Sequence, residues 1–169
     1  FTAWSEQVAP EEVMRTLNRY FERIVQVVEA HGGFVDKFIG DAIMAIFGAP
    51  HAQADHAAQA LSCARAMQAA LAQMNAERAF GDKQLAIGIG VNTGPLVAGT
   101  LGAEQRAEST VIGDTVNVAA RLEASAAPGQ ILLSEATRLA LSGALRVTPL
   151  GERQLRGRTQ SIRVFEVSR

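Results

Sequence analysis

The chain has 169 residues, which is enough for one domain with a sizeable core. Hydrophobic residues make up 48% and charged residues 20%, an ordinary globular composition that argues against disorder. The formal net charge of −1 gives no electrostatic footprint for a nucleic acid or an anionic membrane. The single cysteine, Cys63, cannot form an internal disulfide, which fits a reducing compartment. No apolar run approaches the roughly 20 residues that span a bilayer.

Helical and strand signals alternate in the first half of the chain. A proline followed by two acids is typical of a helix start, and apolar residues then recur at helical spacing until a pair of glycines. The two strands that follow are joined by Gly40-Asp41, with glycine at the first position of a type II′ turn. The elements predicted here are a helix from Pro10 to Gly32-Gly33, strands Phe34–Ile39 and Ala42–Phe47, and a helix from about Asp55 to Phe80.

The second half begins with a strict alternation from Leu85 to Val91, which predicts a strand. One face of this strand is nearly free of side chains, so we expect another element to pack closely against it. The polar stretch from Gly102 to Ser109 indicates an exposed loop, and the tail from Leu145 to Val167 indicates short edge strands. The other predicted elements are strands Leu96–Leu101, Val111–Ile112 and Ile131–Ser134, a helix from Thr115 to Ser125 and a short helix ending at Leu141.

This order predicts an α+β fold. We expect a ferredoxin-like β-α-β-β-α-β core with additional C-terminal strands and a helix, in which helices cover one face of a mixed sheet. Such a core needs a strand before its first helix, and we find none before Pro10. The chain also starts at Phe1 without an initiator methionine. We therefore expect a single domain over residues 1–169 that lacks its first strand and belongs to a longer protein.

Two short stretches carry residues suited to nucleotide chemistry. Lys37 and Asp41 are four residues apart around the Gly-Asp turn, and Thr110 precedes a helix that presents Asn117 and Arg121 on one face. Taken singly, each residue has an ordinary interpretation as a surface lysine, a turn aspartate, a strand threonine or a polar helix stripe. Together they offer a metal ligand, side chains that recognise a nucleobase, a polar group that orients the substrate and a positive charge that binds phosphate.

The same stretches resemble a known family. The segments FVDKFIGDAIMAIFGAP (residues 34–50) and STVIGDTVNVAARLEA (residues 109–124) resemble the two signature regions of the class III nucleotidyl cyclases. Phe1-Thr2 resembles the end of that family's first-strand motif, and Leu155-Arg156-Gly157 resembles its Leu-Lys-Gly segment. The resemblance covers essentially the whole chain in the family's order. The first metal-binding aspartate of the motif would stand just before Phe1.

The resemblance implies a role for each residue. The implied roles are second metal-binding aspartate for Asp41, base reading for Lys37 and Thr110, ribose orientation for Asn117, transition-state stabilisation for Arg121, and triphosphate binding for Arg156. Arginine in place of the family's lysine at Arg156 keeps the charge but replaces a point donor by a planar fork.

The chemistry of Lys37 and Thr110 favours adenine. A lysine can only donate and a hydroxyl can accept, which complements the N1 acceptor and the 6-amino donor of adenine. Guanine reverses both groups, so Lys37 would face a donor at a cost of roughly 1–3 kcal/mol. GTP-preferring members of the family carry an acid at the position of Lys37.

The implied activity is that of an adenylate cyclase, which converts ATP to 3′,5′-cyclic AMP and pyrophosphate with two Mg²⁺ or Mn²⁺ ions per site. The family's sites lie at a dimer interface, so we expect a homodimer. We also expect an upstream sensor or regulatory domain. The net charge of −1 leads us to expect no nucleic-acid partner. We expect the catalytic domain to be cytoplasmic and leave open whether the full-length protein is attached to a membrane. The alternative is a catalytically silent cyclase-like module for dimerisation or regulation.

Overall fold

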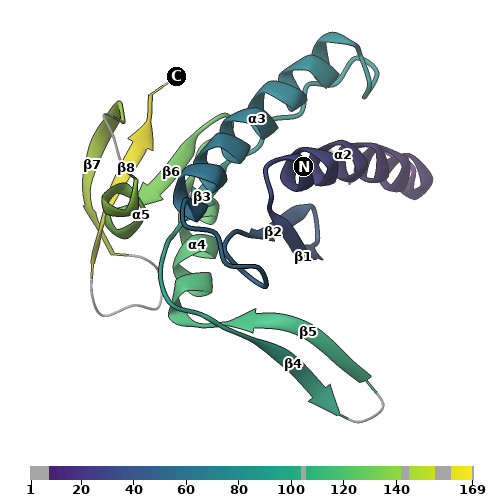
Figure 1. Cartoon of the computed structure of the whole chain (residues 1–169). Helices are drawn as coiled ribbons and strands as arrows, with labels where there is room; N and C mark the ends of the chain where they lie inside the picture. Colours follow the sequence, from purple (N-terminus) through teal and green to yellow (C-terminus); the bar gives the residue numbers. More distant parts are fainter. Residues whose placement is uncertain (1–7, 104–105, 142–144, 155–160, 169) are drawn as a thin grey trace.

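The computed structural model describes residues 8–103, 106–141, 145–154 and 161–168 (Figure 1). The elements in chain order are α2 (Pro10–Ala30), β1 (Phe34–Ile39), β2 (Ala42–Ile46), α3 (His56–Ala76), β3 (Ile89–Val91), β4 (Val97–Ala103), β5 (Arg106–Ile112), α4 (Asp114–Ser125), β6 (Ile131–Ser134), α5 (Glu135–Ala140), β7 (Val147–Arg153) and β8 (Ile162–Val167). The residues at Phe1, where we predicted the end of a missing first strand, lie outside the described ranges. Within those ranges, no helix combines the length and apolar character needed to cross a bilayer.

The predicted α+β class with a mixed sheet is confirmed. Four strands form one sheet in the order β3-β6-β8-β7, in which β3 and β6 are parallel and the other pairs are antiparallel. In the described residues, the hairpins β1-β2 and β4-β5 are hydrogen-bonded separately from this sheet. The tail forms strands as predicted, but only β7 lies at an edge. The prediction was wrong for β8, because its buried Val164 and Val167 suit an interior strand between β6 and β7.

Helices cover both faces of this sheet rather than one. All four residues of β6 are buried. Ile131 and Leu133 pack with Leu61 and Ala64 of α3, whereas Leu132 packs with Leu122 and its neighbours on α4. Successive strand residues point to opposite faces, so α3 and α4 lie on opposite sides of β6. The expected covering of a single face was wrong, because a strand that is apolar on both faces needs a partner on each.

A second apolar cluster joins α2 to α3. Ile24 and Val28 of α2 are fully buried and pack with Leu71 and Met74 of α3. Figure 1 shows these two helices running beside each other, with the hairpin β1-β2 below α2. The predicted start of α2 is confirmed, with Pro10 in its first turn.

Two boundaries differ from the prediction, and at the first of them a side chain takes over the pairing. The strand predicted from Leu85 starts only at Ile89. The amide of Asn75 bonds both the N–H and the C=O of Leu85, at 2.9 and 2.7 Å, and so occupies the groups that a neighbouring strand would use. The helix predicted to reach Phe80 ends at Ala76.

The predicted loop from Gly102 to Ser109 was also wrong. Most of this stretch belongs to the hairpin of β4 and β5, whose residues pair from Val97 with Ile112 out to Ala103 with Arg106. Backbone hydrogen bonds hold an antiparallel ladder, so its sequence can be polar and charged. The hairpin projects away from the body of the molecule (Figure 1).

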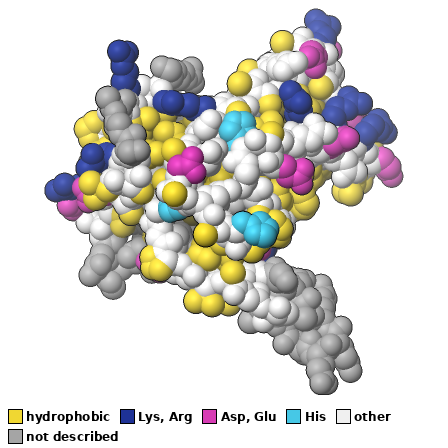
Figure 2. Space-filling model, viewed as in Figure 1, with side chains coloured by type: hydrophobic (Ala, Val, Ile, Leu, Met, Phe, Trp, Pro, Cys, Tyr) yellow, Lys and Arg dark blue, Asp and Glu magenta, His cyan; other side chains and the backbone are white. Residues whose placement is uncertain are grey.

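Charged side chains do not gather on the face shown in Figure 2. Lysine and arginine side chains lie along its upper and left edges, and acidic ones stand beside them at the upper right and at the left edge. The described part of this face therefore lacks a basic stripe of the kind that follows a phosphate backbone.

Candidate active site

Lys37 and Thr110 meet although they belong to different hairpins. The Nζ of Lys37 on β1 donates a hydrogen bond of 2.7 Å to Oγ1 of Thr110 on β5. Thr110 is buried, whereas the Lys37 side chain is 36% exposed. The two residues predicted to read the base therefore lie side by side, and part of the Lys37 side chain remains open to solvent.

Asp36 completes this cluster, and the sequence analysis missed it. Its Oδ2 accepts a hydrogen bond of 3.3 Å from Oγ1 of Thr110 and lies 3.4 Å from Nζ of Lys37. Only 1% of the Asp36 side chain is exposed. A buried carboxylate is costly unless it is paired and hydrogen-bonded, and Lys37 and Thr110 meet both needs.

A β-bulge lets the neighbours Asp36 and Lys37 reach the same atom. In a regular strand their side chains would point to opposite faces. The pairing of β1 with β2 shifts between Val35, which faces Ala45, and Lys37, which faces Met44, so Asp36 is the additional residue. The bulge depends on how the strands pair, which the amino-acid pattern of β1 alone does not reveal.

Asp41 lies at the tip of the β1-β2 hairpin. Gly40 before it has a φ of +63°, as the predicted type II′ turn requires of its first residue. The exposed Asp41 borders a cleft of about 270 Å³ that Tyr20 and Glu123 also line. Small and apolar residues of β2, of the segment 86–90 and of α4 form most of the remaining wall.

Glu123 on α4 is a second acidic group at this cleft, and the sequence analysis did not select it. Partial burial and then the negative charge of Asp41 raise the pKa of Glu123. Burial and then the charges of Asp41 and Glu123 raise the pKa of Tyr20. The negative potential of this cleft therefore favours a bound cation.

The oxygen donors of Asp41 and Glu123 fit Mg²⁺ or Mn²⁺. Mg²⁺ is often held by one or two carboxylates together with the phosphates of a substrate. In the described residues, no group of three or more His, Cys, Asp or Glu side chains is placed to hold a metal. The cleft thus suits an ion that is shared with a phosphate group, and the role of Asp41 as a metal ligand stays a prediction.

Asn117 and Arg121 lie on a different side of α4 from this cleft. Asn117 is exposed and Arg121 is partly buried. The face of α4 that lines the cleft with Asp41 consists of Val116, Ala119, Ala120 and Glu123. At 3.6 residues per turn, the centre of the Asn117–Arg121 pair lies roughly 130° around the helix from the centre of that face. Within one chain, Asp41 and the Asn117–Arg121 pair therefore face different directions.

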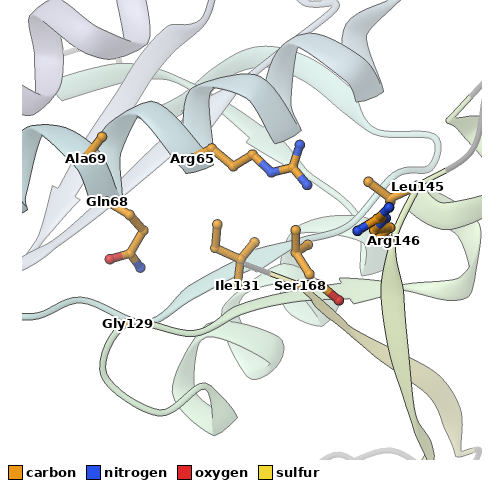
Figure 3. Close-up of a pocket in the computed structure, with 9 residues that line it drawn as sticks. Arg65, Gln68, Ala69, Gly129, Ile131, Leu145, Arg146 and Ser168 are labelled. Carbon is orange, nitrogen blue, oxygen red and sulfur yellow. The ribbon is translucent and has the colours of Figure 1, made fainter.

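One predicted residue and one cavity stand apart from these groups. Arg156 lies outside the described residues. A cavity of about 650 Å³ lies between α3 and the ends of β6 and β8 (Figure 3). Arg65 and Arg146 extend along it, and none of the described site residues lines it.

The adenylate and guanylate cyclase catalytic domain family model matches residues 1–167. The chain is 38% identical to adenylate cyclase 1 of Rhizobium meliloti (strain 1021) over 99% of its own length, and 42% identical to the adenylate cyclase of Anabaena cylindrica over 73%. It spans 26% and 24% of the lengths of those two relatives.

Solved structures with the same fold include both guanylyl and adenylyl cyclases. The guanylyl cyclase Cya2 matches with a TM-score of 0.93 and 38% identity, over 99% of this chain and 85% of that one. The adenylyl cyclase CyaB from P. aeruginosa matches with a TM-score of 0.89 and 30% identity, over 99% and 88%. The chain belongs to the family of adenylate and guanylate cyclase catalytic domains.

Proposed function

We propose that this chain is the catalytic domain of an adenylate cyclase that converts ATP to 3′,5′-cyclic AMP and pyrophosphate. The observation that carries the choice of ATP is the 2.7 Å hydrogen bond between Lys37 and Thr110. It places a donor beside an acceptor in one small cluster, which complements N1 and the 6-amino group of adenine. The relatives include both adenylate and guanylyl cyclases, so the base preference rests on these two side chains.

The remaining site residues supply binding and charge. Asn117 orients the ribose so that its 3′-oxygen approaches the α-phosphorus. Arg121 stabilises the negative charge that develops on the α-phosphate oxygens, and such preorganised electrostatic stabilisation is a large part of many catalytic effects. Arg156 binds the triphosphate. Asp41 holds a divalent ion, which when bound lowers the pKa of the attacking hydroxyl and neutralises phosphate charge.

A homodimer is part of the proposal. Asp41 and the Asn117–Arg121 pair point in different directions, so one chain does not turn both toward one substrate. A second copy related by two-fold symmetry can bring its own pair to Asp41, which makes two equivalent sites. Apolar side chains are available for such an interface, because Val97 and Ile112 at the base of the β4-β5 hairpin are 72% and 54% exposed.

The chain spans about a quarter of the length of its two curated relatives. We therefore propose that it is the catalytic part of a longer protein, with a sensor or regulatory domain upstream.

The experiment is a product assay of the full-length protein with ATP or GTP and with Mg²⁺ or Mn²⁺. We expect cyclic AMP from ATP, little cyclic GMP from GTP, and loss of activity when EDTA removes the metal. The silent-module alternative predicts no cyclic nucleotide with either ion. It is disfavoured because dimerisation alone gives no physical reason to keep Lys37, Asp41, Asn117 and Arg121 together. A preference for GTP would contradict the assignment of Lys37 and Thr110.

A further inference from the structure

We propose that Asp36 is a specificity-determining residue that forces the hydroxyl of Thr110 to act only as an acceptor toward the base. The inference rests on the proposed cyclase function and deepens it. It assigns the rejection of 6-oxopurines partly to a buried carboxylate that does not itself touch the nucleotide.

The directions of the hydrogen bonds carry the argument. A hydroxyl has one proton and two lone pairs, an ammonium group can only donate, and a carboxylate can only accept. Lys37 therefore donates to Oγ1 of Thr110 at 2.7 Å, and Thr110 must donate its one proton to Oδ2 of Asp36 at 3.3 Å. A single lone pair of the hydroxyl is left. It can accept from the 6-amino group of adenine but has no proton for the 6-oxygen of hypoxanthine or guanine.

Burial makes this orientation hard to change. Thr110 is 9% exposed and the Asp36 side chain 1% exposed, so water offers little alternative pairing to either group. Turning the hydroxyl proton toward a base would leave the carboxylate with one partner fewer. An unsatisfied buried acceptor is more costly than an exposed one, so the arrangement penalises a substrate that needs a donor at this point.

The β-bulge is the feature that makes the arrangement possible. Without the additional residue in β1, the side chains of Asp36 and Lys37 would leave the strand on opposite faces. Bulges are common where a strand must re-aim a side chain next to a functional site. Here the bulge turns the Asp36 carboxylate toward the site. Its charge pairs with Lys37, and its Oδ2 accepts the proton of the Thr110 hydroxyl.

The test compares ATP with ITP, whose base has a 6-oxygen and a protonated N1. The conflict of that N1 proton with Lys37 is the same in every protein that retains Lys37, so it cancels between wild type and variants. We measure the ratio of kcat/KM for ATP to kcat/KM for ITP in the full-length protein. Because both substrates are measured on one preparation, the fraction of folded enzyme also cancels.

Removing the acceptor should relax the preference. In Asp36→Ala the Thr110 hydroxyl is free to donate to a 6-oxygen, and we expect the ATP/ITP ratio to fall by about five- to tenfold, the value of one hydrogen bond. Asp36→Leu removes the acceptor while filling the volume and should give the same fall, which guards against a folding defect in the alanine variant. In Asp36→Asn the amide oxygen can replace Oδ2, so the ratio should stay within about threefold of wild type.

A double-mutant cycle separates specificity from general damage. In a Thr110→Val background there is no hydroxyl to orient, so Asp36→Ala should leave the ratio unchanged within about twofold. Glu135→Ala is the matched control, because it removes a partly exposed carboxylate paired with Arg163 away from the site. An unchanged ratio in both Asp36→Ala and Asp36→Leu, or an equal fall in the Thr110→Val background, overturns the role of Asp36. Absence of any cyclic product from wild type would instead overturn the proposed function.

Discussion

The Nζ of Lys37 and the hydroxyl of Thr110 lie 2.7 Å apart, although the two residues are separated by 73 positions in the chain. If this pair reads adenine, changing both residues should remove the preference for ATP. In the double variant Lys37→Glu and Thr110→Cys, the acid takes away the donor that N1 requires. We expect the ATP/GTP ratio of kcat/KM to fall by at least about tenfold, since one unpaired group costs roughly 1–3 kcal/mol.

Asp36 limits what that double variant can gain. A glutamate at position 37 would stand next to the buried Asp36 carboxylate, and like charges at this distance repel. We therefore expect loss of ATP use without efficient GTP use until Asp36→Asn is added. Arg15→Glu on the exposed surface of α2 is the control for the same change in charge. Full retention of the ATP preference in the double variant would show that these two positions do not read the base.

A second prediction concerns the close approach of β3 to α4. A Cβ at Gly90 would stand 2.6 Å from the carbonyl oxygen of Ala119 and 2.8 Å from the Cβ of Leu122. Gly90→Ala should therefore destabilise the protein by about 1–3 kcal/mol, a fall in Tm of roughly 2–10 °C. Gly99→Ala on β4 is the matched control, because nothing lies within 4 Å of its added Cβ. Thermal unfolding of both variants checks this, and equal Tm values would contradict the packing.

The surroundings of Gly90 also show how much of the fold the sequence predicts. The alternation from Leu85 to Val91 predicted a strand with one bare face and a closely packed neighbour, and the packing of Gly90 against α4 confirms the neighbour. The length of the strand was wrong, because pairing of Leu85 with the amide of Asn75 depends on a tertiary contact. Local patterns predict the type of an element well, while its limits depend on what the rest of the chain brings to it.

The candidate site likewise contains residues that the sequence predicted and residues that it did not. Lys37 and Thr110 were selected because their motifs resemble those of a family, and the structure brings them into contact. Asp36 was not selected, although it is the next residue to Lys37. A strand with regular alternation would have turned it away, and only the shift in pairing between Val35 and Lys37 turns it inward. Glu123 was missed because it comes near Asp41 only where α4 and the hairpin β1-β2 line the same cleft, which the sequence alone does not reveal.

The third prediction is a pH effect that originates at Cys63. Burial raises the pKa of this thiol from 9.0 to about 11. The folded state thus holds the proton in a range where the unfolded chain has lost it, so the thiol's contribution to stability is fully present below about pH 9 and is lost as the pH rises toward 11. We expect the free energy of unfolding of wild type to fall faster over that range than that of Cys63→Ala. Urea unfolding of both proteins from pH 8 to pH 11 measures the difference, and parallel curves would rule out the effect.

The last prediction concerns the sharing of a site between two chains. If Asp41 of one chain works with Asn117 and Arg121 of the other, the inactive variants Asp41→Ala and Arg121→Ala should rescue each other. A mixed dimer then has one site with both lesions and one with neither. Random mixing makes half of the dimers mixed, so roughly a quarter of the wild-type activity should return under exchanging conditions. The matched control mixes Arg121→Ala with Asn117→Ala, whose lesions lie in the same half of the site, so that no mixed dimer gains an intact site. Recovery in the first mixture and none in the second is expected from the roughly 130° between the two faces of α4. No recovery in either mixture would mean that each chain turns Arg121 toward its own Asp41, against the direction that α4 gives these side chains.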